Sequence, residues 1–101
     1  MTEPSPPLPI VHNLAQSRFE AQVDGGLAHV DYRRVGGTLH MMHTEVPPAA
    51  EGRGIAAALV QAALDYAEGN GLSVMPLCSY VRAYIRRHPD TQALLAPSAR
   101  L

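Results

Sequence analysis

The stretch Glu51-Gly52-Arg53-Gly54-Ile55-Ala56 lies between a proline pair, Pro47-Pro48, and an alanine-rich segment with helical periodicity. Its glycines let the backbone approach a ligand closely, and the helix that follows begins with amide groups that have no intrahelical acceptor. Such amides carry partial positive charge and bind phosphate groups. Because an arginine lies in the same loop, the stretch predicts a site for a phosphorylated ligand at the start of a helix.

The segment after the loop has the period of a helix that packs on a sheet. Its apolar stripe contains Ile55, Leu59, Ala63 and Tyr66, with Ala56, Val60, Leu64 and Ala67 beside it. Gly69-Asn70-Gly71 ends the helix, and Leu72 to Cys78 then reads as a strand. A strand reached through a helix and a tight turn lies parallel to the strand before the helix, by a right-handed crossover.

The residues before the loop alternate between apolar and polar side chains, the period of a half-buried strand. Phe19 to Val23 and Ala28 to Tyr32 form two such runs, separated by the hairpin signal Asp24-Gly25-Gly26. A second glycine pair leads into a third run, Thr38 to Val46. The pattern predicts a three-stranded antiparallel meander, with a further short strand near residues 10–13.

The third run is polar on both parities toward its C-terminal end, in His43-Thr44-Glu45. Three readings fit: this end lines a site, it contains a bulge that reverses the faces, or it is an exposed strand end. Beyond the last strand, Ser79 is placed to cap a helix from Tyr80 to Arg87, and a short helix is expected near Thr91 to Leu95. The predicted fold is therefore α/β (α+β): an antiparallel β-meander, a β-α-β crossover and a closing helix pair.

Composition limits the classes of protein that fit. The chain has 101 residues, 47% of them hydrophobic, and a net charge of −1, so it suits one modest core and lacks the field of a nucleic-acid binder. We expect one domain over residues 10–95, a disordered proline-rich tail over 1–9 and a C-terminal tail over 96–101. A single cysteine, no secretory segment and no membrane-length apolar run favour the cytoplasm.

Four blocks in order resemble the GNAT superfamily of N-acetyltransferases, and more closely its short, single-domain YjdJ-like branch. They are His43-Thr44-Glu45-Val46-Pro47, the glycine stretch, Pro76-Leu77-Cys78 and Tyr84-Ile85-Arg86-Arg87-His88-Pro89. The resemblance covers about residues 10 to 95 and implies a minimal GNAT-like fold. It also implies acetyl-CoA as cosubstrate, with the pyrophosphate on backbone amides of the glycine loop. Glu51 departs from the family's Gln or Arg at that position, and Arg53 is placed to compensate.

In the resembling fold the pantetheine arm of coenzyme A runs between two parting strands, and the thioester lies near the end of the earlier one. The implied coenzyme-binding residues are Thr44, Glu45, Val46, Glu51, Gly52, Arg53, Gly54, Ile55, Ala56, Cys78 and Tyr80. Acetyl transfer needs a base for the amine and an acid for the departing thiolate. Glu45 and His43, on one parity, are candidates for the base, and Tyr80 or Tyr84 for the acid; each also fits an ordinary solvated or core role.

Cys78 directly precedes a predicted helix, where a thiolate is favoured over a thiol. The resembling branch also has a cysteine there, close to the expected thioester. Cys78 therefore either accepts the acetyl group transiently, packs beside the coenzyme sulfur, or is a small buried hydrophobe. His40 and His43 fall on opposite faces of a regular strand, so we expect no metal site.

Two classes of function remain open. The first is a small N-acetyltransferase that acts on an unidentified amine, a macromolecular one included; thioester hydrolysis through Cys78 is a lesser variant. The second is a non-catalytic acyl-CoA-binding module. The acceptor side is expected to be open because only Asp24-Gly25-Gly26 stands where longer relatives have helices. A monomer or weak homodimer, with no nucleic-acid or membrane partner, completes the expectation.

Overall fold

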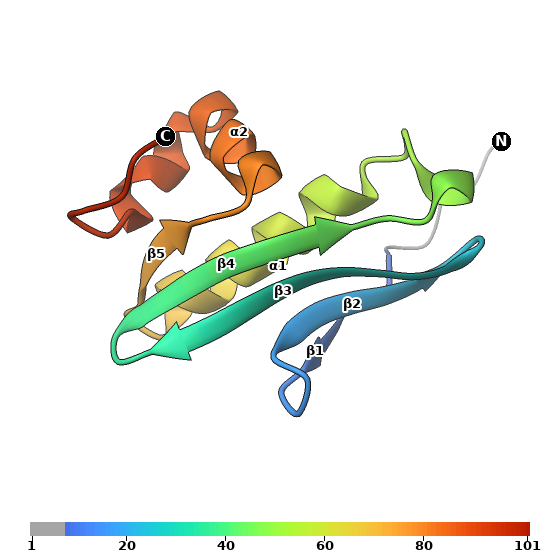
Figure 1. Ribbon diagram of the computed structural model, residues 1–101, viewed down its shortest axis with the longest axis horizontal. Helices are drawn as coiled ribbons and strands as arrows, with labels where there is room; N and C mark the ends of the chain where they lie inside the picture. The colour runs from blue at the N-terminus through green and yellow to red at the C-terminus, as the bar shows by residue number, and fades with distance from the viewer. Residues whose placement is uncertain (1–7) are drawn as a thin grey trace, which may run out of the picture.

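The structure is a computed structural model that describes residues 8–101. The elements follow one another along the chain in the order shown in Figure 1. They are β1 (Val11–Asn13), β2 (Arg18–Val23), β3 (Gly26–Val35), β4 (Thr38–Glu45), the 3₁₀ helix η1 (Pro48–Ala50), α1 (Ile55–Gly69), β5 (Ser73–Pro76), α2 (Ser79–Arg87) and the 3₁₀ helix η2 (Pro89–Leu94).

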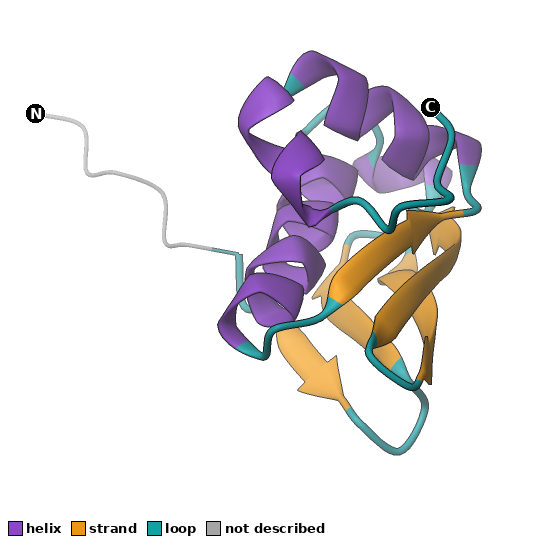
Figure 2. Ribbon diagram, turned by 90° about the vertical axis from the view of Figure 1, so that its left-hand side faces the viewer, coloured by secondary structure: helices purple, strands orange, loops and turns teal. Residues whose placement is uncertain are grey.

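The strands form one five-stranded sheet in the order β1-β2-β3-β4-β5. The pairs from β1 to β4 are antiparallel, whereas β5 runs parallel to β4 after the α1 crossover. Helix α1 lies behind the sheet in Figure 1, and Figure 2 shows the helices gathered on one side of the strands. No helix of residues 8–101 covers the other side, which we call the open face. The predicted meander and crossover are confirmed.

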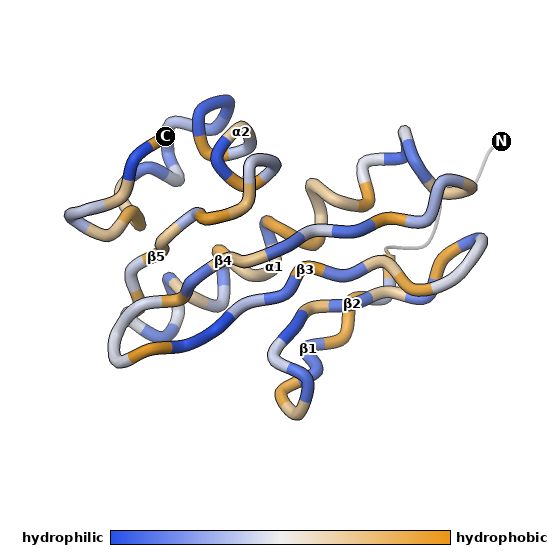
Figure 3. The backbone as a smooth tube through the Cα atoms, viewed as in Figure 1, coloured by the Kyte–Doolittle hydropathy of each residue, from blue (hydrophilic) through white to orange (hydrophobic). Residues whose placement is uncertain are grey.

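The core lies between the sheet and α1. The two-residue period of β2 and β3 directs one set of side chains toward the helix, and the alternation of colours along these strands is visible in Figure 3. The largest fully buried side chains are Leu39, Met41, Leu59, Leu64, Ile85, Val30, Val60, Val74 and Val81. They come from strands and helices on both sides of the crossover, so the described chain folds around one core.

A β-bulge interrupts β4. Asp31 is paired with His43 and Tyr32 with Met41, which leaves Met42 without a partner on β3. The extra residue places both Met42 and His43 in exposed positions, and Thr44 returns to the covered face opposite the buried Val30. The reversal of faces that explains the polar end of this strand is therefore present.

The remaining differences from the sequence-based prediction lie at the ends of elements. β5 ends at Pro76: the Leu77 amide makes the last hydrogen bond of the ladder, to Met41 O, and the Cys78 amide donates to the same oxygen instead of to a residue further along β4. Cys78, with extended backbone angles, is the N-cap of α2, and Ser79 is the first helical residue rather than the cap. The last helix is 3₁₀ and begins two residues earlier than expected, at Pro89.

The two ends of the chain differ in what the structure describes. Most of the predicted N-terminal tail, residues 1–7, lies outside the described residues. At the other end Ala96 is buried and its amide donates to Val74 O at 2.8 Å. The described part has no helix that combines the length and the apolar character needed to cross a bilayer.

Candidate functional site

The two parallel strands part beside the glycine loop. Their pairing ends with Met41 opposite Pro76, but β4 continues to Glu45. Beyond Met41, β4 therefore has no strand neighbour on its β5 side among the described residues. An unpaired strand edge offers backbone amides and carbonyls to an extended ligand.

A cleft of about 380 Å³ opens where the strands part. It joins the end of β4, the η1 segment, the glycine loop, the first turn of α1 and the start of α2. Its lining residues are Thr44, Val46, Ala50, Glu51, Gly52, Gly54, Ile55, Ala56 and Tyr80. Eight of the residues predicted to bind coenzyme thus lie on one cleft, together with Ala50, whose role the sequence did not indicate. The other three members of the predicted set, Glu45, Arg53 and Cys78, do not line the cleft.

The glycine loop meets the requirements of an anion cradle. Gly52 and Gly54 adopt left-handed angles, with φ of 82° and 76°, which residues with a side chain rarely adopt. A Cβ at either position would meet no protein atom within 4 Å, so the space beside both is open. Gly54 is the N-cap of α1, and no side chain among the described residues caps this end. The first-turn amides are therefore available to a ligand in the cleft.

The two charged residues of the loop point in different directions. Glu51 lies on the cleft, as its sequence position predicted. Arg53 Nη1 instead binds Asp24 Oδ2 at 2.8 Å, on the β2–β3 turn, and both side chains are exposed. Arg53 lines a second hollow, of about 520 Å³, which shares only Gly54 and Ile55 with the cleft. The compensation of Glu51 by Arg53 expected from the sequence is not present in this arrangement.

Cys78 lies across the gap from Thr44, with Sγ 3.6 Å from Thr44 Oγ1. Burial acts to raise the pKa of the Cys78 thiol. The Val81 amide, the Thr44 hydroxyl and the Tyr80 amide act in the opposite direction and hold the pKa below its ordinary value, although no complete capping hydrogen bond forms. The thiol is therefore half-buried at the parting of the strands, with donors that favour its thiolate form.

The two tyrosines considered as acids have different surroundings. Tyr80 lines the cleft and is 38% exposed. Tyr84 is buried between α2 and α1, where its hydroxyl donates to Gln61 and its ring stacks on His88. Burial first, and then the nearby carboxylates of Asp90 and Asp65, raise the pKa of Tyr84. Tyr84 does not line the cleft, so its placement favours the core role.

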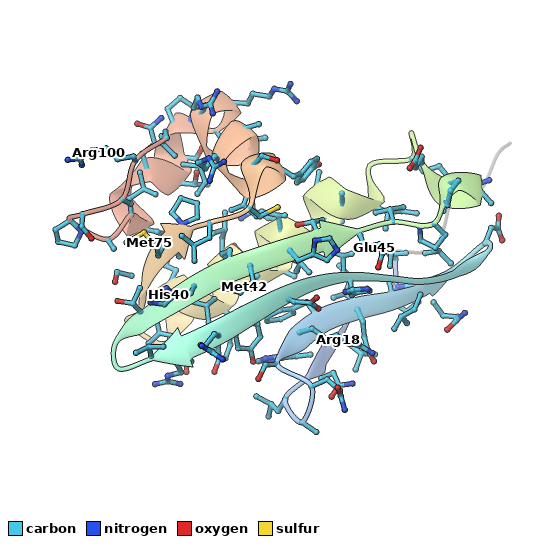
Figure 4. All side chains as sticks on the ribbon, viewed as in Figure 1. Arg18, His40, Met42, Glu45, Met75 and Arg100 are labelled. Carbon is cyan, nitrogen blue, oxygen red and sulfur yellow. The ribbon has the colours of Figure 1, made fainter. Side chains whose placement is uncertain are left out.

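Glu45 and His43 share a face, as their parity predicted, but it is the open face rather than the side of the cleft that Thr44 lines. Glu45 is labelled in Figure 4. Glu45 Oε2 lies 3.1 Å from His29 Nε2, and Asp31 Oδ1 lies 2.8 Å from His29 Nδ1. His29 and Asp31 share a face because they are two residues apart on β3, whereas strand pairing brings Glu45 to them, so the complete carboxylate–imidazole–carboxylate cluster has no signal in the sequence. Neither Glu45 nor His43 lines the cleft with its side chain.

Metal ligation has no support in the described residues, where no group of three or more His, Cys, Asp or Glu side chains is arranged to hold an ion. Asp24-Gly25-Gly26 does not connect the first two strands, contrary to the expectation from the sequence. Those strands are β1 and β2, which residues 14–17 connect, and Asp24-Gly25-Gly26 lies at the turn from β2 to β3.

A strand, glycine loop, helix and parallel strand that parts from the first beside the loop make up the GNAT fold. The chain belongs to the GCN5-related N-acetyltransferase family, whose model matches residues 18–94. Proteins with this fold generally use acetyl-CoA.

Relatives and a solved structure agree with this placement. Protein NATD1 of Xenopus tropicalis is 34% identical over 95 residues, which cover 91% of this chain and 87% of the relative. Human protein NATD1 is 34% identical over 91 residues, covering 87% of this chain and 80% of its own length. The NMR structure of a GCN5-like protein from Staphylococcus aureus superposes with a TM-score of 0.71, at 24% identity and 88% coverage of both chains. That likeness bears on the fold.

Proposed function

We propose that the protein is an acetyl-CoA-dependent N-acetyltransferase that acts on an amine. The observation that carries the proposal is the single cleft that joins an uncapped, glycine-led helix start to Thr44 and Tyr80 at the parting of two strands. One end of the cleft suits phosphate groups. The other end suits a polar thioester that must be held beside a nucleophile.

Coenzyme A fits this cleft by the chemistry of each part. The pyrophosphate accepts hydrogen bonds from the amides of Gly52 to Ala56, where the open space beside the two glycines leaves room for it. The pantetheine arm lies along the unpaired edge of β4 after Met41, where its amides exchange hydrogen bonds with the strand. An amide of the segment Thr44 to Val46 then faces the thioester carbonyl and stabilises its oxyanion.

The transfer itself requires two proton movements. The neutral amine attacks the carbonyl carbon, and the bond from that carbon to the coenzyme sulfur breaks. The nitrogen loses a proton, and the departing thiolate gains one. Tyr80, on the cleft, is the proposed proton donor to the sulfur, in preference to the buried Tyr84.

Cys78 offers a two-step variant of the same transfer. Its thiolate attacks the carbonyl carbon and displaces the coenzyme thiolate, and the resulting Cys78 thioester then gives the acetyl group to the amine. Placement beside Thr44 and the lowered pKa of the thiol support this variant. Intact-mass measurement after incubation with acetyl-CoA tests this two-step transfer. The two-step transfer predicts an acetyl adduct on the wild-type chain and none on Cys78→Ala.

The acceptor approaches from the open face in this proposal. Beyond Met41 no strand of the described chain separates that face from the cleft, and Glu45 directly follows Thr44. The Glu45 side chain is 61% exposed, and only one of its carboxylate oxygens, Oε2, contacts His29. An ammonium group can therefore reach the carboxylate and transfer a proton to it. An uncovered face suits a bulky or macromolecular amine.

One observation favours a second candidate, a non-catalytic acyl-CoA-binding module. The side chains of both base candidates lie on the open face, and no acceptor wall is built by the described residues. Thermal-shift measurements with acetyl-CoA, CoA and desulfo-CoA, followed by thiol release with a panel of amines, separate the two. Stabilisation with amine-dependent release supports the transferase. Stabilisation without release on any amine supports the module, and no stabilisation contradicts both.

A further inference from the structure

The two peptide units that precede Cys78 are held on both sides by the same pair of residues. On one side, Met41 O accepts the amide of Leu77 at 3.0 Å and the amide of Cys78 at 3.1 Å. On the other side, Arg82 Nη1 donates to Pro76 O at 3.3 Å and to Leu77 O at 3.0 Å. Each peptide therefore has its N–H fixed by Met41 and its C=O fixed by Arg82.

At the end of β5, the Arg82 side chain supplies the hydrogen-bond donors that a neighbouring strand would otherwise supply. Because the amides of Leu77 and Cys78 point toward Met41, the carbonyls of Pro76 and Leu77 point away from β4, to an edge where no strand of residues 8–101 pairs with them. A guanidinium has several donors in one plane and stays charged, so it satisfies two adjacent carbonyls at once. The main chain of Arg82 adds a third link, because its amide donates to Cys78 O at 3.1 Å and closes the first turn of α2.

The orientation of these peptides decides where the Cys78 thiol lies. With the Leu77–Cys78 peptide held in one orientation, the φ of −85° at Cys78 sets the direction of its side chain, which lies toward Thr44 and the first amides of α2. The groups that favour the thiolate are the Thr44 hydroxyl on β4 and the amides of Val81, Tyr80 and Thr44, with no charged side chain among them. Their effect depends on direction and distance, so a rotated peptide would weaken it.

We propose that Arg82 is a positioning residue for the site: by clamping the Pro76–Cys78 segment against Met41, it holds the Cys78 thiol at the parting of β4 and β5. Arg82 itself does not line the cleft. The inference rests on the proposed function only for the role of the thiol beside the acyl group, because the clamp is a property of the chain alone.

The test is the pH profile of alkylation of Cys78 by iodoacetamide, measured by intact mass. Cys78 is the chain's one cysteine, so the adduct reports that site alone. Arg82→Met removes the donors and keeps most of the length. Arg86→Met is the matched control, since it removes the same charge one turn later in α2 from an exposed position. Arg82→Lys restores a cationic donor without the planar fork.

We expect the wild type and Arg86→Met to share one profile. In Arg82→Met the midpoint should move to higher pH, and alkylation at neutral pH should slow by about threefold or more, since about 0.7 kcal/mol of lost thiolate stabilisation is a factor of about three. Arg82→Lys should fall between them. An Arg82→Met profile that coincides with the wild type overturns the proposal, as does a shift of equal size in Arg86→Met.

Folding is checked by circular dichroism, and Arg82→Lys decides the matter if Arg82→Met does not fold. In Arg82→Lys the amides of Leu77 and Cys78 should exchange hydrogen faster than in the wild type, while the Ser73 amide, which donates to Gly37 O, keeps its protection. Unchanged exchange together with an unchanged alkylation profile contradicts the proposal. None of these measurements contains coenzyme. Protection of Cys78 from alkylation by acetyl-CoA tests the proposed function separately, so either can fail without the other.

Discussion

Thr44 and Cys78 face each other across the gap between β4 and β5, with 3.6 Å between Oγ1 and Sγ. The two residues reach this position by separate irregularities. The bulge at Met42 turns Thr44 to the covered face, and the end of β5 at Pro76 releases Cys78 from the ladder. The side chains of Thr44 and Cys78 therefore meet where two regular parallel strands would form backbone hydrogen bonds.

Replacing Thr44 by valine should make Cys78 less reactive. The hydroxyl donates to the sulfur when Cys78 is a thiolate, and it is one of the groups that keep the pKa of the thiol low. Loss of a hydrogen bond worth about 0.5 to 1.5 kcal/mol predicts alkylation that is slower by about twofold to tenfold at neutral pH. Thr38→Val is the control, because Thr38 binds Ser73 at the other end of β4. Equal rates in the two variants would contradict this role of Thr44.

Replacing Gly54 by alanine should reduce both stability and affinity for acetyl-CoA. The left-handed angle predicts a cost of about 1 to 2 kcal/mol in the free energy of unfolding. The added methyl group occupies the open space beside the loop, and we expect binding to weaken by about tenfold or more. Gly36→Ala is matched in angle, with φ of 58° and equally open surroundings, but lies in the β3–β4 turn. It should lose stability and keep its affinity.

Replacing Glu51 by glutamine should strengthen the binding of coenzyme. The carboxylate lies on the cleft, and Arg53 is engaged with Asp24 rather than with it. Removing a like charge near the phosphates is worth about 1 kcal/mol, or about fivefold in affinity at low salt, and the gain should shrink as salt is added. Calorimetric titration measures both effects. Glu68→Gln removes the same charge near the other end of α1 and should leave the affinity unchanged.

Acidification should destabilise the fold partly through His12. The ring stacks on Phe19, and Nε2 lies 2.6 Å from Tyr32 Oη; burial lowers the pKa of His12 below its ordinary value of 6.5. Between that value and the lower folded pKa, the unfolded chain binds more protons than the folded chain, so stability falls as pH falls. The free energy of unfolding, measured with urea at pH 8 and at pH 5, should change less between the two pH values in His12→Phe than in His40→Gln, a control on the open face. An equal change in both variants would show that His12 does not contribute to the loss of stability in acid.

The sequence was sufficient wherever a periodic pattern determines structure. Alternation in residues 19–32 and the helical stripe after Ile55 predicted the meander, the crossover and the side of α1 that is buried, because each depends on a local period. The helix end predicted at Gly69-Asn70-Gly71 is also confirmed, because α1 ends at Gly69 and Gly71 has a left-handed angle.

The parts that the sequence did not decide depend on register and on contacts between distant residues. Polarity at His43-Thr44-Glu45 was compatible with a bulge, but only pairing with β3 shows which residue is extra. The same pairing brings Glu45 to His29, which Asp31 already contacts along β3. The engagement of Arg53 by Asp24 has no sequence signal, because exposed arginines have many equivalent partners.

The central claim is that the amides of Gly52 to Ala56 bind the pyrophosphate of acetyl-CoA. The most direct measurement is the change in backbone ¹H–¹⁵N shifts during titration with acetyl-CoA, compared with S-acetylpantetheine, which lacks the pyrophosphate. We predict saturable shifts at residues 52–56 and along Met42 to Glu45 with acetyl-CoA, and shifts along β4 alone with the truncated thioester. Saturable binding of acetyl-CoA that leaves the amides of residues 52–56 unmoved, or no binding at all, would contradict the claim.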